Sequence, residues 1–435
     1  MKRIAIIGGG IAGLTCAWQL HQLGQPFTLY EATPRLGGTV RTLHRDGFTI
    51  EQGPDGWVTE KPWAAELARD LGLGDELTPS NDAGRVTWIV RDNKLMAMPD
   101  GMRMMVPTDL LALEGSPLFS DEARAAYAAE PARAEELRAA APDQDESIAA
   151  FVLRHYGHEV LNAVAAPLLA GVFGGDVWKL SVRAVMPRFV EMERQHGSLI
   201  TALQSLVRRD SPSIFTTLAS GLGTLIDRMA AALPAGSVRM SAPINSIPDS
   251  DHIILATPAH VIRTLLRGLA PERAVELLPA EASSAVLVAL AFDEEFALPA
   301  GFGFLVPHSE PSQLLAATFV DQKFPGRVPP GKRLLRAFFG GANGLALTSL
   351  DDGALAALAH AELVRILGPL PVPAFSTVQR WPLSLPQYEV GHLDRMTELA
   401  GLLPSNVHLL GNAYRGVGLP DLIRDARALA RQLTS

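Results

Sequence analysis

The residues best suited to chemistry stand near the start of the chain, where glycines recur as Gly8, Gly10 and Gly13 between an apolar run and an amphipathic stretch. This G-x-G-x-x-G spacing predicts a tight turn whose backbone N–H groups approach a pyrophosphate at a helix N-terminus. Glu31 stands eighteen residues after Gly13, where a carboxylate accepts hydrogen bonds from a ribose diol. The pattern predicts a dinucleotide site, and the alternative is a plain strand–helix turn with a surface glutamate. The same predicted site includes Gly9, Ile11 and Ala12.

A second pair of glycines follows the acidic residue. The segment EATPRLGGTVRT places Arg35 and the doublet Gly37-Gly38 soon after Glu31. A further glycine doublet lets the backbone pack against an extended cofactor, and the nearby arginines suit its phosphates. Folds that bind only NAD usually lack this feature, so the segment favours FAD.

A third glycine-rich stretch, GNAYRGVGLPD, runs from Gly411 to Asp421 between a strand pattern and a helix pattern. FAD is longer than one strand–helix–strand unit can hold, and its flavin end needs a site of its own. Backbone N–H groups and the helix dipole at this turn suit the N1–C2=O edge of a flavin, where negative charge develops on reduction. We therefore expect the flavin end of FAD at this turn.

The bulk composition restricts the class of protein. The chain has 435 residues and a formal net charge of -8, which argues against nucleic-acid binding. Its single cysteine, Cys16, allows no disulfide framework and is predicted to be a small core residue. We expect neither a secretory signal nor a membrane span, because no run reaches the roughly 18 apolar residues that a span requires. These features predict a cytoplasmic protein.

The order of the expected elements indicates a nested architecture. The first forty residues follow a strand–helix–strand pattern, residues 107–209 are helical in pattern, and residues 285–340 are rich in strand patterns. We expect an α/β fold with α+β inserts, in which a Rossmann-like FAD-binding domain carries an inserted mixed-sheet substrate domain and an inserted helical domain. The expected boundaries are 1–80, 210–284 and 375–435 for the first domain, 81–107 and 285–374 for the second, and 108–209 for the third.

Several longer stretches are more specific. They are GFTIEQGPDGWVTEKP from Gly47, LLAGVFGGDVWKLSVRAVMPRFVEMERQHGSLI from Leu168, GFGFLVP from Gly301 and RWPLSLPQYEVGHLDRM from Arg380. Together with the C-terminal GNAYRGVGLPD, they resemble the protoporphyrinogen/coproporphyrinogen oxidase family, the FAD enzymes of haem biosynthesis within the amine-oxidase-like flavoproteins. The similarity covers nearly the whole chain and implies a GR2-type FAD-binding domain.

The resemblance implies further cofactor contacts. They are Gly53, Val238, Gly411, Asn412, Gly416, Val417, Gly418 and Leu419, in addition to the glycines, Glu31 and Arg35 given above. Asn412 departs from the Gly-Asp pair that related flavoproteins often have at this point. An amide can still bond a ribityl hydroxyl, so the departure bears on the contact and not on the cofactor.

The resemblance also implies a substrate pocket. It places Phe302, Gly303 and Leu305 over the flavin, Phe338 opposite them, and Arg85 at a substrate propionate. The alternative for the apolar residues is an ordinary core position, and the alternative for Arg85 is a solvated surface arginine. We assign no catalytic residue and no metal ligand from the sequence.

The implied activity is oxidation of protoporphyrinogen IX to protoporphyrin IX by dioxygen, with release of hydrogen peroxide. Coproporphyrinogen III is the alternative substrate. Another flavin amine oxidase, a carotenoid desaturase and a flavin-binding scaffold without turnover, such as a haem-pathway partner, remain open. The oligomeric state also remains open.

Two features of the helical stretch need an interpretation. His155 and His158 are one helical turn apart in RHYGH, and no third ligand recurs at metal-binding spacing, so a solvated helix face is predicted. Residues 108–210 resemble the part that the family uses at a membrane face. Peripheral membrane contact therefore stays an open expectation.

Overall fold

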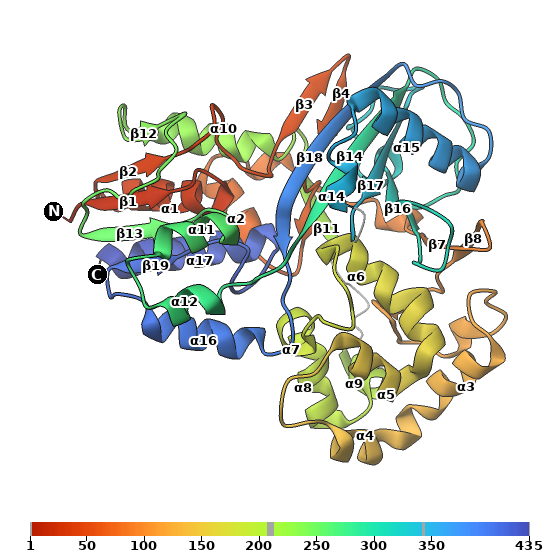
Figure 1. Cartoon of the computed structure of the whole chain (residues 1–435). Coiled ribbons are helices and arrows are strands. Elements are labelled where there is room, and N and C mark those ends of the chain that lie inside the picture. The colour runs from red at the N-terminus through yellow and green to blue at the C-terminus, as the bar shows by residue number, and fades with distance from the viewer. Residues whose placement is uncertain (1, 207–212, 342–343, 435) are drawn as a thin grey trace.

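The computed structural model describes residues 2–206, 213–341 and 344–434. It contains a parallel sheet wrapped by helices, a seven-stranded mixed sheet and a group of helices (Figure 1). Both ends of the chain lie in the part with the parallel sheet, on the left of the figure. The five strands of the parallel sheet come from the beginning, the middle and the end of the sequence. The chain therefore leaves this part of the molecule and returns to it twice.

The five strands of the parallel sheet lie in the order β12-β2-β1-β13-β19. The central strand reads IAII and is buried along its whole length, as expected for a parallel strand covered on both faces. One face packs against α1, α2, α10 and α17, and the other against α11, α12 and α16. The strands are β1 (Ile4–Ile7), β2 (Phe27–Tyr30), β12 (Val238–Arg239), β13 (His252–Leu255) and β19 (Val407–Leu409). The helices are α1 (Ile11–Gln22), α2 (Trp63–Asp70), α10 (Gly223–Ala232), α11 (Ala259–Leu266), α12 (Glu272–Leu277), α16 (His392–Leu402) and α17 (Leu419–Thr434).

The mixed sheet has the order β18-β14-β17-β16-β15-β7-β8. Helix α15 covers one face, and the hairpin of β3 and β4 packs against part of the other. Asp92 and Asn93 both have positive φ and form the turn that joins the antiparallel strands β7 and β8. The elements are β3 (Thr42–Arg45), β4 (Phe48–Glu51), β7 (Thr87–Arg91), β8 (Lys94–Ala97), β14 (Ala282–Phe292), β15 (Gly303–Leu305), β16 (Leu314–Phe319), β17 (Arg333–Phe339), β18 (Phe375–Pro386) and α15 (Asp352–Leu367).

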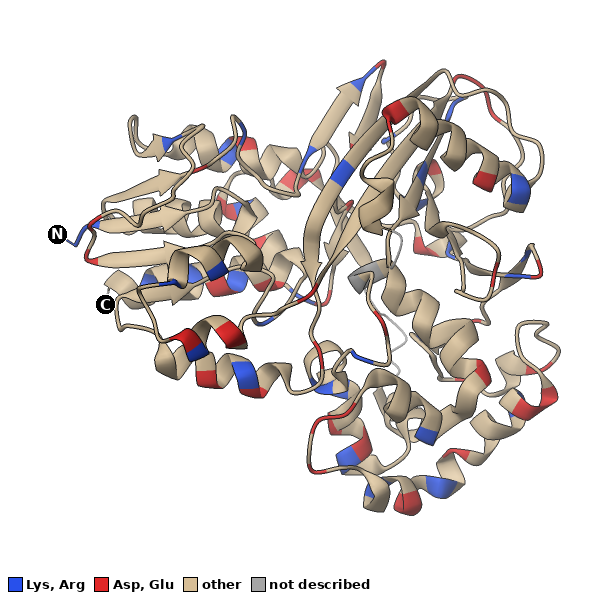
Figure 2. Ribbon diagram, viewed as in Figure 1, with Lys and Arg blue, Asp and Glu red and all other residues tan. Residues whose placement is uncertain are grey.

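The helical part has its own apolar core. Helix α5 departs from helical geometry at Gly157, and a π-helical turn at Leu161–Ala165 leads into α6. Helix α6 carries no charged residue and lies between the other helices and the mixed sheet, where it contacts β15 and β16 (Figures 1 and 2). The helices are α3 (Asp121–Ala129), α4 (Ala134–Ala140), α5 (Ile148–Val160), α6 (Ala166–Phe173), α7 (Val182–Val185), α8 (Pro187–His196) and α9 (Leu199–Leu206).

Short elements complete the described chain. A small sheet has the order β5-β11-β6, and β9 pairs with β10. Two short helices contact strands of the mixed sheet. These short elements are β5 (Trp57–Val58), β6 (Leu77–Pro79), β9 (Met102–Arg103), β10 (Val106–Pro107), β11 (Phe215–Leu218), α13 (Val320–Lys323) and α14 (Gly344–Leu347). Single 3-10 turns are at Gly74–Glu76, Asp82–Gly84, Leu111–Leu113 and Pro131–Arg133. Within the described ranges, no helix is both long and apolar enough to cross a membrane.

Two expectations about single residues have different outcomes. Cys16 is fully buried in α1, as predicted. The prediction that His155 lies on a solvated helix face is wrong, although its neighbour His158 is exposed. His155 is buried, and its ring nitrogens lie 3.0 Å from carboxylate oxygens of Glu130 and of Glu193. These two glutamates come from other elements, so the helical spacing of the histidines alone could not reveal them.

Candidate cofactor and substrate site

The first glycine turn joins β1 to α1. The Gly8 N–H donates to the carbonyl of Tyr30 at 2.8 Å, which ties the turn to the neighbouring strand β2. A Cβ atom on Gly13 would stand 2.0 Å from the Gly8 carbonyl oxygen, so only glycine allows α1 to start this close to β1. Gly10 precedes the helix with extended backbone geometry. The predicted turn is therefore formed, with the N-terminus of α1 directed at the second glycine pair.

Glu31 follows directly after β2 and lies beside this turn. Its Oε2 atom accepts the Gly9 N–H at 2.8 Å, and its Oε1 atom accepts the backbone N–H and the hydroxyl of Thr33 at 2.9 and 2.7 Å. The side chain is half-exposed, so the carboxylate is held in place but can still be reached. A carboxylate fixed at the end of the second strand is the arrangement that a ribose diol requires.

The second glycine pair lies against the first turn. The Gly37 N–H donates to the Gly9 carbonyl at 2.8 Å, and a Cβ atom on Gly38 would come within 3.1 Å of Gly10 Cα. The Arg35 guanidinium donates to the carbonyls of Leu36 at 2.8 Å, of Val40 at 2.9 Å and of Gly38. Burial, followed by the nearby Arg41, lowers the pKa of Arg35. Arg35 thus shapes the loop, and its predicted phosphate contact stays a prediction.

Two further predicted cofactor residues extend the same site. A Cβ atom on Gly53 would stand 1.9 Å from the Thr39 carbonyl, so the loop after β4 packs directly onto the loop of the second glycine pair. Val238 lies on the edge strand β12 opposite Leu29 of β2 and is half-buried. Gly53 therefore borders the second glycine loop, and the predicted cofactor contact of Val238 stays a prediction.

The C-terminal turn lies between β19 and α17. The Tyr388 hydroxyl donates to the Asn412 carbonyl at 2.6 Å and accepts the Gly416 N–H at 3.0 Å, which ties both ends of the turn together. The Asn412 amide nitrogen donates to the Ser384 carbonyl at 2.9 Å, so its amide oxygen is the atom left for a ribityl hydroxyl. Among the described residues, no acceptor is present for the N–H groups of Val417 and Gly418.

The C-terminal turn depends on two glycines and contacts two hydrophobic cores. Gly411 has a φ of 130° and Gly416 a φ of 146°, which other residues rarely adopt. Val417 packs against the core of the helical part, whereas Leu419 begins α17 and packs against the core beneath the parallel sheet. The free N–H groups and the N-terminus of α17 form a positive edge suited to the flavin carbonyl.

Most of the predicted substrate residues lie on one face of the mixed sheet. Leu305 is opposite Ala316, and Ala316 is opposite Phe338, so these three side chains form a row across β15, β16 and β17. With strands about 4.8 Å apart, the row is roughly 10 Å long. Gly171 of α6 faces this row, because a Cβ atom there would stand 3.6 Å from Leu305. An apolar sheet face and an uncharged helix therefore bound the predicted pocket.

Arg85 and Phe302 have different positions relative to this face. Arg85 directly follows a 3-10 turn and lies two residues before β7. Ile89 of β7 is opposite Leu305 and packs toward the helical part, and a pocket role for Arg85 stays a prediction. Within the described chain, the Arg85 side chain has no ion-pair partner, and it is half-exposed. Phe302 instead shares the alternation of Phe304, whose ring is buried on the α15 side. A pocket role for Phe302 stays a prediction.

Gly303 begins β15 and lies close to the backbone of the neighbouring strand β16. Its φ is 137°, and a Cβ atom would lie 1.9 Å from the Ala317 carbonyl. Any other residue would push β15 away from β16. Gly303 therefore positions the face that carries Leu305.

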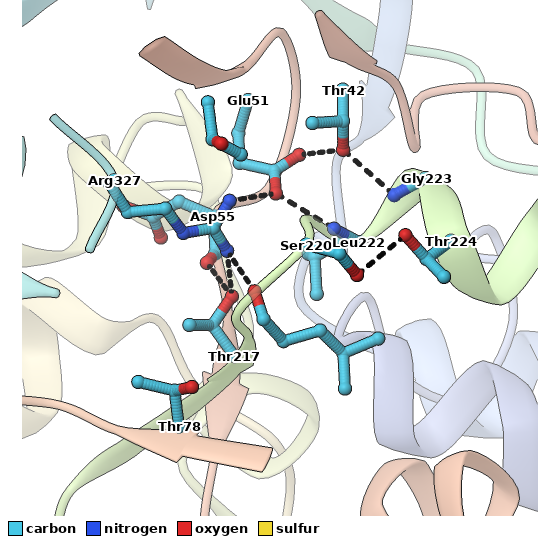
Figure 3. Close-up of polar contacts among 12 residues, drawn as sticks. Thr42, Glu51, Asp55, Thr78, Thr217, Ser220, Leu222, Gly223, Thr224 and Arg327 are labelled. Carbon is cyan, nitrogen blue, oxygen red and sulfur yellow. Dashed lines mark hydrogen bonds and ion pairs between the residues drawn. The ribbon is translucent and has the colours of Figure 1, made fainter. Parts of the chain in front are cut away.

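A buried network of charges beside the site was missed in the sequence. Arg327 and Glu51 form an ion pair at 2.9 Å, and Glu51 also accepts the Thr42 hydroxyl at 2.7 Å (Figure 3). Close by, Asp55 pairs with Arg336 at 3.0 Å and with Lys323 at 2.9 Å. In the sequence, this network is indicated by Arg336, a charged residue in the middle of the otherwise apolar run RLLRAFF.

These ion pairs fix the charge of Asp55. Burial raises the pKa of the Asp55 carboxyl, but the nearby Lys323 and Arg336 outweigh this effect and lower the pKa to about 2. The carboxylate is therefore ionised at all pH values at which the protein would be used.

Comparisons with known proteins agree with this geometry. The flavin containing amine oxidoreductase family matches residues 11–434. The chain is 30% identical to the coproporphyrinogen III oxidase of Bacillus subtilis over 98% of this chain and 97% of that protein. It is 31% identical to the coproporphyrinogen III oxidase of Propionibacterium freudenreichii (99% and 90% covered) and 26% identical to the chloroplastic protoporphyrinogen oxidase of Nicotiana tabacum (99% and 85% covered).

Solved structures give the same result. A provisionally named protoporphyrinogen oxidase from Exiguobacterium sp. 255-15 superposes with a TM-score of 0.87 at 29% identity and covers 100% of this chain and 98% of its own. A reduced UDP-galactopyranose mutase shares the fold, with a TM-score of 0.72 at 14% identity. The chain therefore belongs to the flavin containing amine oxidoreductases, within the protoporphyrinogen/coproporphyrinogen oxidase family. The predicted Rossmann-like FAD-binding fold is confirmed.

The chain's own residues fit the FAD that this family uses. Buried polar atoms without a partner among the described residues border the two glycine turns and the C-terminal turn: they include Gln52 Oε1 next to Gly53, Thr257 Oγ1 beside Gly8, and the Tyr414 hydroxyl. Buried polar atoms normally have hydrogen-bond partners. Phosphates, hydroxyls and a flavin ring along this path would supply them. FAD is the cofactor.

Proposed function

We propose that this protein oxidises a porphyrinogen to a porphyrin, with dioxygen as the electron acceptor and hydrogen peroxide as the second product. The observation that carries the proposal is the apolar row of Leu305, Ala316 and Phe338. This row lies against the uncharged helix α6, and the neighbouring strand β7 begins two residues after Arg85, which would reach the same pocket. A porphyrinogen has the matching chemistry, namely a broad apolar ring with carboxylate arms.

The sheet face and Arg85 would divide the work of binding. Burying apolar surface contributes about 25 cal/mol per Å², so a macrocycle that lies against these apolar walls gains several kcal/mol without polar contacts. Arg85 would then orient one propionate through a charge-assisted hydrogen bond. The apolar walls also keep water away from the reacting carbon. No general base is assigned, and the chain would act by orientation and electrostatics.

The reaction balances as three two-electron oxidations. Bound FAD supplies the acceptor for a hydride from a meso carbon of the macrocycle. Each round also releases one pyrrole N–H proton, and tautomerisation of the ring between rounds presents the next meso carbon. Three hydrides and three protons leave in total, and three molecules of dioxygen become three of hydrogen peroxide.

Coproporphyrinogen III is the substrate that we propose. The sequence alone favoured protoporphyrinogen IX, but the two coproporphyrinogen III oxidases described above are 30% and 31% identical to the chain, against 26% for the tobacco protoporphyrinogen oxidase. Coproporphyrinogen III has two propionates where protoporphyrinogen IX has two vinyl groups. We further propose the three-domain division given by the expected boundaries, with the pocket between the mixed sheet and the helical domain.

Steady-state turnover of both porphyrinogens tests this proposal. Porphyrin fluorescence and hydrogen peroxide are measured together in air, and we expect a higher kcat/KM for coproporphyrinogen III and three peroxides per porphyrin. Arg85→Met should raise KM at least tenfold with little change in kcat, whereas Arg85→Lys should recover part of the loss. Porphyrin formation without hydrogen peroxide would refute dioxygen as the electron acceptor. Turnover of amines but of neither porphyrinogen would refute porphyrinogens as the substrate class.

A further inference from the structure

Five charged side chains meet where the loop after β4 lies under the mixed sheet. Arg327 pairs with Glu51 at 2.9 Å, and Asp55 pairs with Arg336 at 3.0 Å and with Lys323 at 2.9 Å. Among the described residues, no other carboxylate lies within ion-pair distance of these three cations. Three positive charges therefore share two negative ones, and the cluster has a surplus of one positive charge.

The surplus charge is buried. The side chains of Arg327 and Arg336 are each 2% exposed and that of Lys323 is 13% exposed, so water solvates them poorly. A buried charge without a counter-charge is costly to the fold. The Arg336 Nε–H is also buried and has no hydrogen-bond partner in the described chain. Both features point to an anion that is absent from the protein's own set of side chains.

Arg336 lies between the two halves of the site. Its guanidinium donates to the Gly53 carbonyl and stands 5.0 Å from the centre of the Phe338 ring. Gly53 packs directly on Thr39 of the second glycine loop. Phe338 is two residues further along β17 and on the same sheet face as Arg336. Arg336 thus contacts both the cofactor loop and the wall of the proposed pocket.

We propose that the surplus positive charge of Arg336 and Lys323 is the counter-charge for the anion that FAD becomes when it accepts a hydride. Oxidised flavin is neutral at its ring, and addition of a hydride leaves one negative charge on it. The cluster would therefore raise the reduction potential of the bound flavin. Arg336 and Lys323 are positioning residues, since they act through the field at the cofactor loop and not by touching the reacting carbon.

Two measurements on the FAD-loaded protein test this role without any porphyrinogen. One is the two-electron reduction potential of the flavin, and the other is the dissociation constant of sulfite, which adds to the flavin and leaves a negative charge on it. Arg336→Met and Lys323→Met should each weaken sulfite binding at least tenfold and lower the potential by about 30 mV, the value of a tenfold change for a two-electron couple. Asp55→Asn removes a negative charge and should shift both quantities in the opposite direction.

Matched variants separate charge from structure. Arg336→Lys keeps the charge and should stay within about threefold of the wild type, a spread that ordinary context effects produce. Arg333→Met breaks a comparable pair with Asp321 three residues earlier on β17 and should change neither quantity. If Arg336→Met does not fold, the less buried Lys323 and the opposite sign expected for Asp55→Asn still decide the question.

The outcomes are distinct. Opposite shifts in the cation and carboxylate variants support the proposal, because loss of packing would move all variants in one direction. Unchanged potential and sulfite binding in FAD-saturated Arg336→Met and Lys323→Met overturn it. A rise in KM for porphyrinogens with no change in potential also overturns it, and assigns the charge to a substrate propionate. The proposal rests on FAD binding, so failure of the proposed porphyrinogen activity would leave this test valid.

Discussion

A methyl group on Gly13 would strain the contact between α1 and β1. The added Cβ atom would lie 2.0 Å from the Gly8 carbonyl oxygen and 3.1 Å from Ala256 Cβ, and these neighbours directly follow β1 and β13 of the parallel sheet. The helix would have to move away from the strand. Forcing extra atoms into a packed core costs about 1–3 kcal/mol, and the severity of this contact places Gly13→Ala near the upper end.

Gly10→Ala is the matched control three residues earlier. Its Cβ atom would meet nothing closer than Gly38 Cα at 3.9 Å, and the φ of −64° at Gly10 suits alanine. The loss of folding stability should therefore stay below about 1 kcal/mol, the usual range for a change at a helix N-cap. The methyl group would, however, enter the space between the two glycine turns, where the pyrophosphate is predicted. FAD binding should weaken at least tenfold, or about 1.4 kcal/mol.

Two assays separate these effects. Urea unfolding of the FAD-free protein gives the stability, and quenching of flavin fluorescence on titration gives the affinity. We expect Gly13→Ala to lose both, and Gly10→Ala to lose affinity while it keeps most of its stability. Wild-type FAD affinity in Gly10→Ala would refute the placement of the cofactor at this turn, and equal destabilisation of the two variants would refute the steric argument.

Three further predictions concern other parts of the molecule. Arg327→Met leaves Glu51 buried without its partner and should lower the free energy of unfolding by about 3–5 kcal/mol in urea titrations; a smaller loss than 1 kcal/mol would contradict the role of the pair. Burial lowers the pKa of His155, but hydrogen bonds to its two glutamate partners outweigh this effect and raise the pKa. The contribution of protonated His155 to folding stability is therefore complete below about pH 6.5 and is lost as the pH rises through the raised pKa. The stability gap between the wild type and His155→Gln should therefore narrow at alkaline pH, and a gap that widens would contradict the assignment. Leu305→Trp should fill the proposed pocket and lower kcat/KM for porphyrinogens at least tenfold without changing FAD affinity, and unchanged turnover would place the pocket elsewhere.

The cofactor turns were predictable because their function is local. Gly8, Gly13 and Glu31 lie within one strand–helix–strand unit, where the spacing alone fixes which backbone atoms meet. The structure confirms the fold that these residues indicate. It also shows what spacing cannot: the Arg35 side chain is bonded to the carbonyls of its own loop.

The charge cluster was not predictable for the opposite reason. Asp55 and Arg336 come from distant parts of the chain, and only the packing of the mixed sheet on the loop after β4 brings them together. The partners of His155 are hidden in the same way, since a helical spacing defines a face but not what covers that face. For Phe302, strand alternation decides the face, and motif similarity carries no information on it.

Anaerobic mixing of the FAD-loaded protein with coproporphyrinogen III tests the central claim most directly. The account predicts that the visible absorbance of the flavin bleaches in the first turnover, faster with this substrate than with protoporphyrinogen IX. Admission of air should then restore the absorbance and let fluorescent porphyrin accumulate. The contrary result is a flavin that stays oxidised with both porphyrinogens but still loses its visible absorbance when sulfite adds to it. That result would show that the flavin is bound and reactive and that the proposed substrate is wrong.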